Sequence, residues 1–174
     1  QTCTGITGKF SGARFSFLAA NVLYRENEQP IVPPTWIKSI DGVRIGFIGA
    51  VTRATPGIVV PGGVAGVRFV AEAKALNQYA KDLQAQGVQA IVAVVHVGGD
   101  ADGGYGACHN PRGAIFDIAR ELDAAIDIVL SAHTHRGYNC IVDGRVIVQA
   151  ASYGRLVSVV DIEIDRASGK IVRE

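Results

Sequence analysis

Two short apolar-rich runs, each followed at once by histidine, constrain this chain more than any other feature of its sequence. The run at 90–95 leads into His96, and the run at 126–131 leads into His133 and His135. Such runs are typical of strands that are buried on both faces of a sheet. Because a helical pattern lies between the two runs, we expect a strand–helix–strand unit, in which the two strands are parallel.

The three histidines are therefore expected at one edge of the sheet. Parallel strands end on the same side, where ligands bind in open α/β sheets. In extended backbone, residues two apart face the same way, so we expect His133 and His135 to point together toward one site. A single histidine at a strand end is usually structural, but imidazoles gathered at one edge favour a metal site, as in centres with two metals about 3.5–4 Å apart. His109, beside an expected helix start, we interpret as structural or surface.

The rest of the pattern predicts alternating strands, turns and helices around this unit. Asp-Gly between apolar runs is a hairpin signal, and glycine after a periodic apolar stripe ends a helix. The expected elements are a strand at 14–23, a hairpin of 35–40 and 43–51, a loop at 52–66, a helix at 70–86 ended by Gly87, a loop at 98–106, a helix starting at Asn110-Pro111, a hairpin at Asp143-Gly144, a strand at 156–164 and a turn at Ser168-Gly169.

Composition sets the broad class. The 174 residues suit one domain, with 48% hydrophobic and 19% charged residues. A formal net charge of +1 offers no basic field for a nucleic acid polymer. No apolar run is long enough to span a bilayer, and a start at Gln1 leaves room for a leader upstream.

The three cysteines leave one question open. Cys3, Cys108 and Cys140 include no Cys-x-x-Cys pair, which argues against a structural zinc knot. Cys108 and Cys140 form either a disulfide or two unlinked thiols. A disulfide would imply an oxidising compartment.

Several sequence motifs resemble those of one known family. Residues 94–99 (VVHVGG) resemble the His-x-Gly-Gly motif of calcineurin-like metallophosphoesterases, and 130–135 (LSAHTH) resemble their Gly-His-x-His motif. Residues 17–22 (FLAANV) and 42–49 (GVRIGFIG) look like the bacterial 5′-nucleotidase branch, which also includes UDP-sugar hydrolases and cyclic-nucleotide phosphodiesterases. The resemblance runs from about residue 15 to about residue 165.

The resemblance implies a fold, a site and a class of substrate. The fold is α/β: part of a four-layer αββα sandwich with a mixed sheet and a carboxy-terminal β-meander. His96 and His133 would bind one divalent metal and His135 the other, with zinc, manganese or a similar ion in both positions. A nucleotide or nucleotide-sugar would be the substrate, and the location would be periplasmic or secreted. The chain departs from the motif at Ala132, where the family has glycine, and at Val97, where it often has glutamate.

Two earlier motifs of the family, Asp-x-His and Gly-Asn-His-Glu, are absent from the sequence. In the family they supply further metal ligands and the catalytic histidine, so no catalytic residue is assigned here. Three neutral imidazoles lack the bridging carboxylate that offsets the charge of two metals. We therefore expect 1–174 to be a partial domain that also lacks the nucleotide-binding domain following it in the family.

Three alternatives stay open. The chain is part of a nucleotide phosphohydrolase, a non-catalytic fragment or assembly module, or a relative that acts on another substrate. A partial domain would pair with its missing amino-terminal half or with a second copy, because unpaired strand edges favour association.

Other residues are weaker candidates. The glycine-rich stretch 98–106 lacks the Lys-Ser/Thr of a phosphate-binding loop. Asp100 and Asp102 offer carboxylates to a metal or substrate, although solvated loop residues are the simpler interpretation. Arg155 follows a strand and could meet a phosphate, but a surface arginine is the simpler interpretation.

Overall fold

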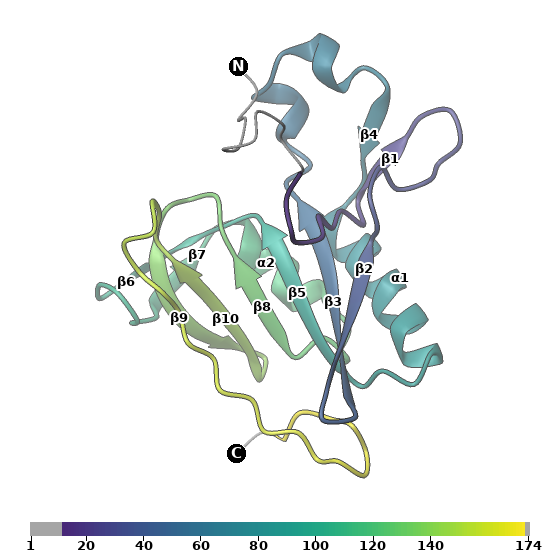
Figure 1. Cartoon of the computed structure of the whole chain (residues 1–174). Helices are drawn as coiled ribbons and strands as arrows, with labels where there is room; N and C mark the ends of the chain where they lie inside the picture. The colour runs from purple at the N-terminus through teal and green to yellow at the C-terminus, as the bar shows by residue number, and fades with distance from the viewer. Residues whose placement is uncertain (1–11, 173–174) are drawn as a thin grey trace, which may run out of the picture.

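The computed structural model describes residues 12–172, so Cys3 lies outside the described residues. Its centre is a six-stranded sheet in the order β2-β3-β5-β8-β10-β9 (Figure 1). The four inner strands are mutually parallel, and the two outer strands are antiparallel to their neighbours. The prediction of a mixed α/β sheet is therefore confirmed. The strands are β2 (Thr35–Ile40), β3 (Val43–Val51), β5 (Ala90–His96), β8 (Ile128–Ser131), β9 (Gly137–Val142) and β10 (Arg145–Ala150).

Both helices, α1 (Glu72–Ala85) and α2 (Ala114–Glu121), cover the same face of this sheet (Figure 1). The apolar stripe predicted for α1 is buried, including Leu76 and Leu83, which are inaccessible to solvent. Gly87 follows the helix with a φ of +79°, a conformation that glycine adopts readily. The predicted helix and its stop signal are confirmed, with the helix starting two residues later than the pattern indicated.

The other face of the sheet is covered in part by the carboxy-terminal segment. Ile45, Ala90, Val92 and Ile128 form a cluster on this face, and partly buried side chains from 160–171 pack against it. The strand predicted at 156–164 is wrong, because this segment makes only an isolated bridge between Ile164 and Ile171. Its alternating apolar residues lie on the face of the sheet and do not extend the sheet edge. Within residues 12–172, the last two strands are thus β9 and β10, which form a hairpin.

The strand predicted at 14–23 is also largely wrong. Only β1 (Val22–Tyr24) forms, and it pairs with β4 (Val67–Phe69) above the sheet. Phe15 and Phe17 remain 69% and 63% exposed, so their alternation does not reflect a buried strand face. The buried Asn21 fixes this segment instead: its Nδ2 donates to the Val51 carbonyl at 2.7 Å, and its Oδ1 accepts the Val51 N–H at 2.9 Å.

Three short elements interrupt the predicted loops. The loop at 52–66 contains two 3₁₀ turns, Thr55–Gly57 and Pro61–Val64. The stretch at 98–106 contains β6 (Asp100–Asp102), which pairs with β7 (His109–Arg112). The Asn110-Pro111 helix start is therefore wrong, because both residues belong to β7 and α2 begins only after Gly113.

A disulfide ties this β6–β7 hairpin to the sheet. Cys108 and Cys140 are bonded, with their Cα atoms 5.1 Å apart, which answers the question that the sequence left open. Cys140 lies on β9 and is fully buried. Among residues 12–172, no helix is both long and apolar enough to cross a membrane.

Candidate metal centre

The carboxyl ends of β5 and β8 bring the histidine motifs together as predicted. The two strands are parallel neighbours, with Val95 opposite Ser131 at their ends. His96 is the last residue of β5, and the loop after β8 carries His133 and His135. All three imidazoles are exposed at this edge.

His96 and His133 form a close pair. Nε2 of His96 lies 3.3 Å from Nδ1 of His133, and the two rings meet edge to face with centroids 5.0 Å apart. When two nitrogens bind the same tetrahedral metal ion, each at about 2.0–2.1 Å, they lie about 3.3–3.4 Å from each other. The pair therefore has the spacing of two ligands to a single metal ion.

His135 does not extend this pair into a three-histidine cluster. His133 and His135 have φ values of +84° and +58°, so the backbone is not extended and the two side chains do not share a face as assumed. The ring of His135 instead meets the Tyr153 ring edge to face at 5.4 Å. Within the part of the chain that the structure describes, no group of three or more His, Cys, Asp or Glu residues has the spacing to hold a metal.

A partly buried polar network fixes the loop that carries the histidines. Thr134 Oγ1 donates to the Gly99 carbonyl at 2.6 Å and accepts from Gln149 Nε2 at 3.1 Å. The hydroxyls of Ser131 and Tyr138 are 2.7 Å apart, and the Tyr138 hydroxyl donates to Gln149 Oε1 at 3.2 Å. Burial raises the pKa of Tyr138, which keeps its hydroxyl protonated as a donor. Sequence reasoning missed this network, although Gln149 in an otherwise apolar strand was a signal for it.

Known proteins are similar to this chain in sequence and in fold. It is 34% identical over 168 residues to Endonuclease YhcR of Bacillus subtilis, covering 97% of the chain and 13% of YhcR. It is 35% identical over 146 residues to Cell wall protein Lmo0130 of Listeria monocytogenes, covering 80% of the chain and 19% of that protein. The chain thus spans less than a fifth of the length of these two relatives. No protein-family model matches it.

Solved structures of a 5′-nucleotidase precursor and of a calcineurin-like phosphoesterase have a fold similar to that of this chain. A 5′-nucleotidase precursor from Thermus thermophilus matches 92% of the chain with a TM-score of 0.73 and 25% identity, over 32% of its own length. The calcineurin-like phosphoesterase YfkN from Bacillus subtilis matches 92% of the chain with a TM-score of 0.75 and 21% identity, over 54% of its length. In sequence and fold, the chain thus resembles the 5′-nucleotidases and calcineurin-like phosphoesterases. The histidine pair thus lies in a segment that carries the predicted family motifs.

Glycine is required where the two histidine loops touch. A Cβ on Gly98 would lie 2.3 Å from the Ala132 carbonyl oxygen and 2.4 Å from Thr134 Oγ1. We predict that Gly98→Ala lowers the free energy of unfolding by about 1–3 kcal/mol, the usual cost of overpacking. Urea denaturation measures this change. The matched control is Gly57→Ala, where a Cβ meets nothing within 4 Å; an equal loss in both variants would contradict the close approach.

The histidine pair should also make the chain sensitive to acid. The pKa of His96 is lowered from its ordinary value by partial burial first, and then by the charges of His133 and His135. Below the ordinary histidine pKa, the unfolded chain therefore binds more protons than the folded chain, and stability falls as the pH falls. We predict that Tm drops less between about pH 7.5 and about pH 5.5 in His96→Gln than in the unsubstituted chain. An equal drop in both proteins would show that His96 does not titrate as described.

The aspartates beside the site hold an arginine. Asp100 and Asp102 each accept from Arg112 at 2.8 Å, across the β6–β7 hairpin. Hydrogen bonds from Arg112 first, and then from Asn110, lower the pKa of Asp102. The two carboxylates therefore brace the hairpin.

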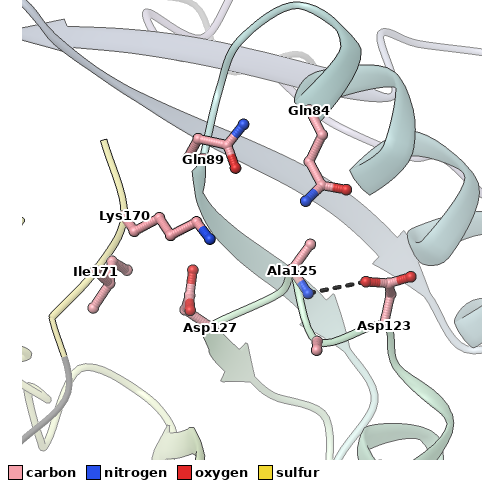
Figure 2. Close-up of a pocket in the computed structure, with 8 residues that line it drawn as sticks. Gln84, Gln89, Asp123, Ala125, Asp127, Lys170 and Ile171 are labelled. Carbon is pink, nitrogen blue, oxygen red and sulfur yellow. Dashed lines mark hydrogen bonds between the residues drawn. The ribbon is translucent and has the colours of Figure 1, made fainter. Parts of the chain in front are cut away.

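A separate cavity of about 340 Å³ lies at the opposite edge of the sheet, between the end of α1 and the carboxy-terminal segment (Figure 2). Gln84, Gln89 and Lys170 point into it, together with Asp127, which immediately precedes β8. No histidine lines this cavity, and the Asp123 carboxylate at its rim accepts the Ala125 N–H at 3.0 Å. We therefore place the candidate centre at the histidine edge.

Proposed function

We propose that this chain is the carboxy-terminal part of the catalytic domain of a metal-dependent hydrolase that acts on nucleotide phosphoesters. His96 and His133 hold one divalent metal, and His135 contributes to a second. The observation that carries the proposal is the 3.3 Å separation of the two imidazole nitrogens at the carboxyl edge of the sheet. Bound metals of this kind supply Lewis-acid stabilisation of phosphoryl charge.

In this proposal, the residues of this chain supply and orient some of the metal ligands, and they do not complete the metal centre. The pair supplies two neutral ligands, and the network around Gln149 fixes the backbone that carries His133 and His135. Residues 1–11 contain no His, Asp or Glu. The carboxylate ligands and the proton-transferring group would therefore come from polypeptide outside this chain.

Relatives support two classes of substrate. The similarity to a structure described as a 5′-nucleotidase precursor favours a nucleotide or nucleotide-sugar. The second candidate is a phosphodiester in nucleic acid, favoured by the 34% identity to a protein named as an endonuclease. The formal net charge of +1 favours the small substrate, because polymer binding relies on many cationic contacts to phosphates.

The disulfide supports a location outside the cytoplasm. Disulfides such as Cys108–Cys140 persist in oxidising compartments and are rare in reducing ones. One relative is named as a cell wall protein. We therefore propose a periplasmic or secreted location.

Metal binding by the chain tests the proposal. We expect isothermal titration with Zn²⁺ or Mn²⁺ to show saturable binding that weakens by at least about tenfold in His96→Ala and in His133→Ala, since each removes one of few ligands. His109→Ala is the matched control, because His109 lies on β7 beside Asp102 and away from the pair. Binding that survives both substitutions, or that His109→Ala weakens equally, would contradict the assignment.

Turnover separates the enzyme from a non-catalytic module. The isolated chain should hydrolyse AMP or a UDP-sugar at little above background even with added metal, because it provides too few ligands. A longer polypeptide that contains this chain should hydrolyse them with metal dependence. Rapid metal-dependent turnover by the isolated chain would contradict the incomplete centre, and an inactive longer polypeptide would favour the assembly module.

A further inference from the structure

A cleft of about 740 Å³ opens directly beside the histidine pair. The loop after β5 and the loop after β8 form two of its walls, and the start of α2 closes a third side. His133, Arg112 and Arg136 all line it. A group bound in this cleft would therefore lie next to whatever the histidine pair holds.

Glycines make up one wall of the cleft, where the packing behind them leaves no room for a Cβ. Gly98, Gly99 and Gly113 line it without side chains. At Gly99 a Cβ would come within 2.6 Å of the Arg112 carbonyl oxygen, and Gly113 has a φ of +105°. The wall is therefore made of backbone, which a compact ligand such as a phosphoryl group can approach closely.

The two arginines of the cleft differ in how their donors are used. Arg112 is occupied, because Nη1 and Nη2 donate to Asp102 and Asp100 at 2.8 Å. Arg136 is 62% exposed, and within residues 12–172 its side chain has a single polar contact, from Nε to Asp100 Oδ1 at 3.5 Å. Its two terminal amino groups are therefore available to a ligand.

Asp100 also sets the direction of Arg136. Its Oδ2 accepts from Arg112 while its Oδ1 faces the Nε of Arg136, so one carboxylate orients both guanidinium groups. The backbone of Arg136 is fixed as well, because its carbonyl accepts the Ala151 N–H at 2.9 Å. A guanidinium that is oriented but not saturated is suited to a phosphate, which it contacts through two parallel hydrogen bonds.

We propose that Arg136 is a specificity-determining residue that binds a second phosphoryl group, adjacent to the one held at the histidine pair. This inference rests on the proposed function for its account of the first phosphoryl group. It assigns the substrate to compounds with a pyrophosphate linkage, such as a nucleoside diphosphate or a nucleotide-sugar, in preference to a monophosphate. Asp100 and Asp102 balance the charges of Arg112 and Arg136, so the cleft has no general positive field. Selectivity for a second phosphoryl group therefore comes from the paired hydrogen-bond donors of the Arg136 guanidinium.

The test uses inorganic pyrophosphate and the full chain without metal, in the presence of a chelator. We expect pyrophosphate to shift the amide resonances of residues 98–100 and 133–136 in a nuclear magnetic resonance titration. Arg136→Gln should weaken pyrophosphate binding by about tenfold, as expected for the loss of a charge-assisted hydrogen bond. Arg136→Lys should restore part of the affinity, and orthophosphate should bind more weakly than pyrophosphate to the unsubstituted chain.

Arg120→Gln is the matched control, because Arg120 is an exposed arginine on α2 that pairs with Asp117 outside the cleft. It should leave pyrophosphate affinity unchanged. Equal weakening by both substitutions, shifts that map elsewhere, or no pyrophosphate binding to the unsubstituted chain would overturn the proposal. Since this titration contains no metal, its result is independent of the metal binding that tests the proposed function.

Discussion

Arg145→Leu is expected to lower the free energy of unfolding by about 3–5 kcal/mol, the range for breaking a buried charged network. Arg145 is only 4% exposed, yet it stands at the start of β10 and reaches the end of α2. Its guanidinium donates to carbonyls at the last turn of that helix and in the loop that follows. The acceptors are Ala119 at 2.6 Å, Ile126 at 2.7 Å, Asp123 at 2.9 Å and Leu122 at 3.2 Å.

The cost is large because leucine removes the charged donor that these four carbonyl groups share in a largely buried region, although those of Ala119 and Asp123 also accept a backbone N–H. Helix carbonyls in the last turn have no partner within the helix, and a cation there also interacts favourably with the helix dipole. In the unfolded chain these carbonyls are solvated by water, so the substitution penalises only the folded state. Chemical denaturation of both proteins measures the difference.

Arg44→Leu is the matched control for this prediction. Arg44 also donates to a carbonyl at a helix end, Gln86 at 2.7 Å, but this bond is exposed to solvent. We expect its loss to cost less than about 1 kcal/mol, because water replaces the donor. Equal costs at Arg44 and Arg145 would show that burial of the α2 carbonyls does not determine the effect.

Reduction of the Cys108–Cys140 disulfide is expected to cost about 3–4 kcal/mol by the loop-entropy relation, for a loop whose ends are 32 residues apart. The bond joins the β6–β7 hairpin to β9, an outer strand of the sheet. Reduction should therefore also loosen the hairpin that holds Asp100 and Arg112 beside the histidine pair. Thermal unfolding with and without a reductant measures the loss.

The Cys108→Ser/Cys140→Ser double variant controls for other effects of the reductant. It should resemble the reduced chain and should not respond to reductant. A double variant as stable as the oxidised chain would contradict the prediction that this cross-link stabilises the fold.

The sequence predicted the elements whose signals are local. The apolar runs before His96 and His133, with a helical pattern between them, identify a parallel strand unit, because apolar periodicity distinguishes these elements. That unit predicts that His96 lies beside His133, although the sequence gives no distance between them. The Asp41-Gly42 hairpin follows in the same way from turn chemistry.

What the sequence could not predict depends on contacts between distant segments. His135 turns toward Tyr153 because the backbone at 133–135 leaves the extended region, which no pattern of side chains reveals. Arg145 looks like a hairpin flank until α2 is placed beside it. The alternation at 156–164 is real, but its apolar residues pack on a sheet face, and periodicity cannot distinguish packing on a face from pairing at an edge.

The most direct test of the central claim is anomalous diffraction from crystals of the chain soaked in zinc. The account predicts an anomalous peak in contact with both Nε2 of His96 and Nδ1 of His133, and its loss in crystals of His133→Ala. A peak elsewhere with none at this pair, or a peak at the pair that persists in the variant, would contradict the claim that these two histidines form part of a metal centre.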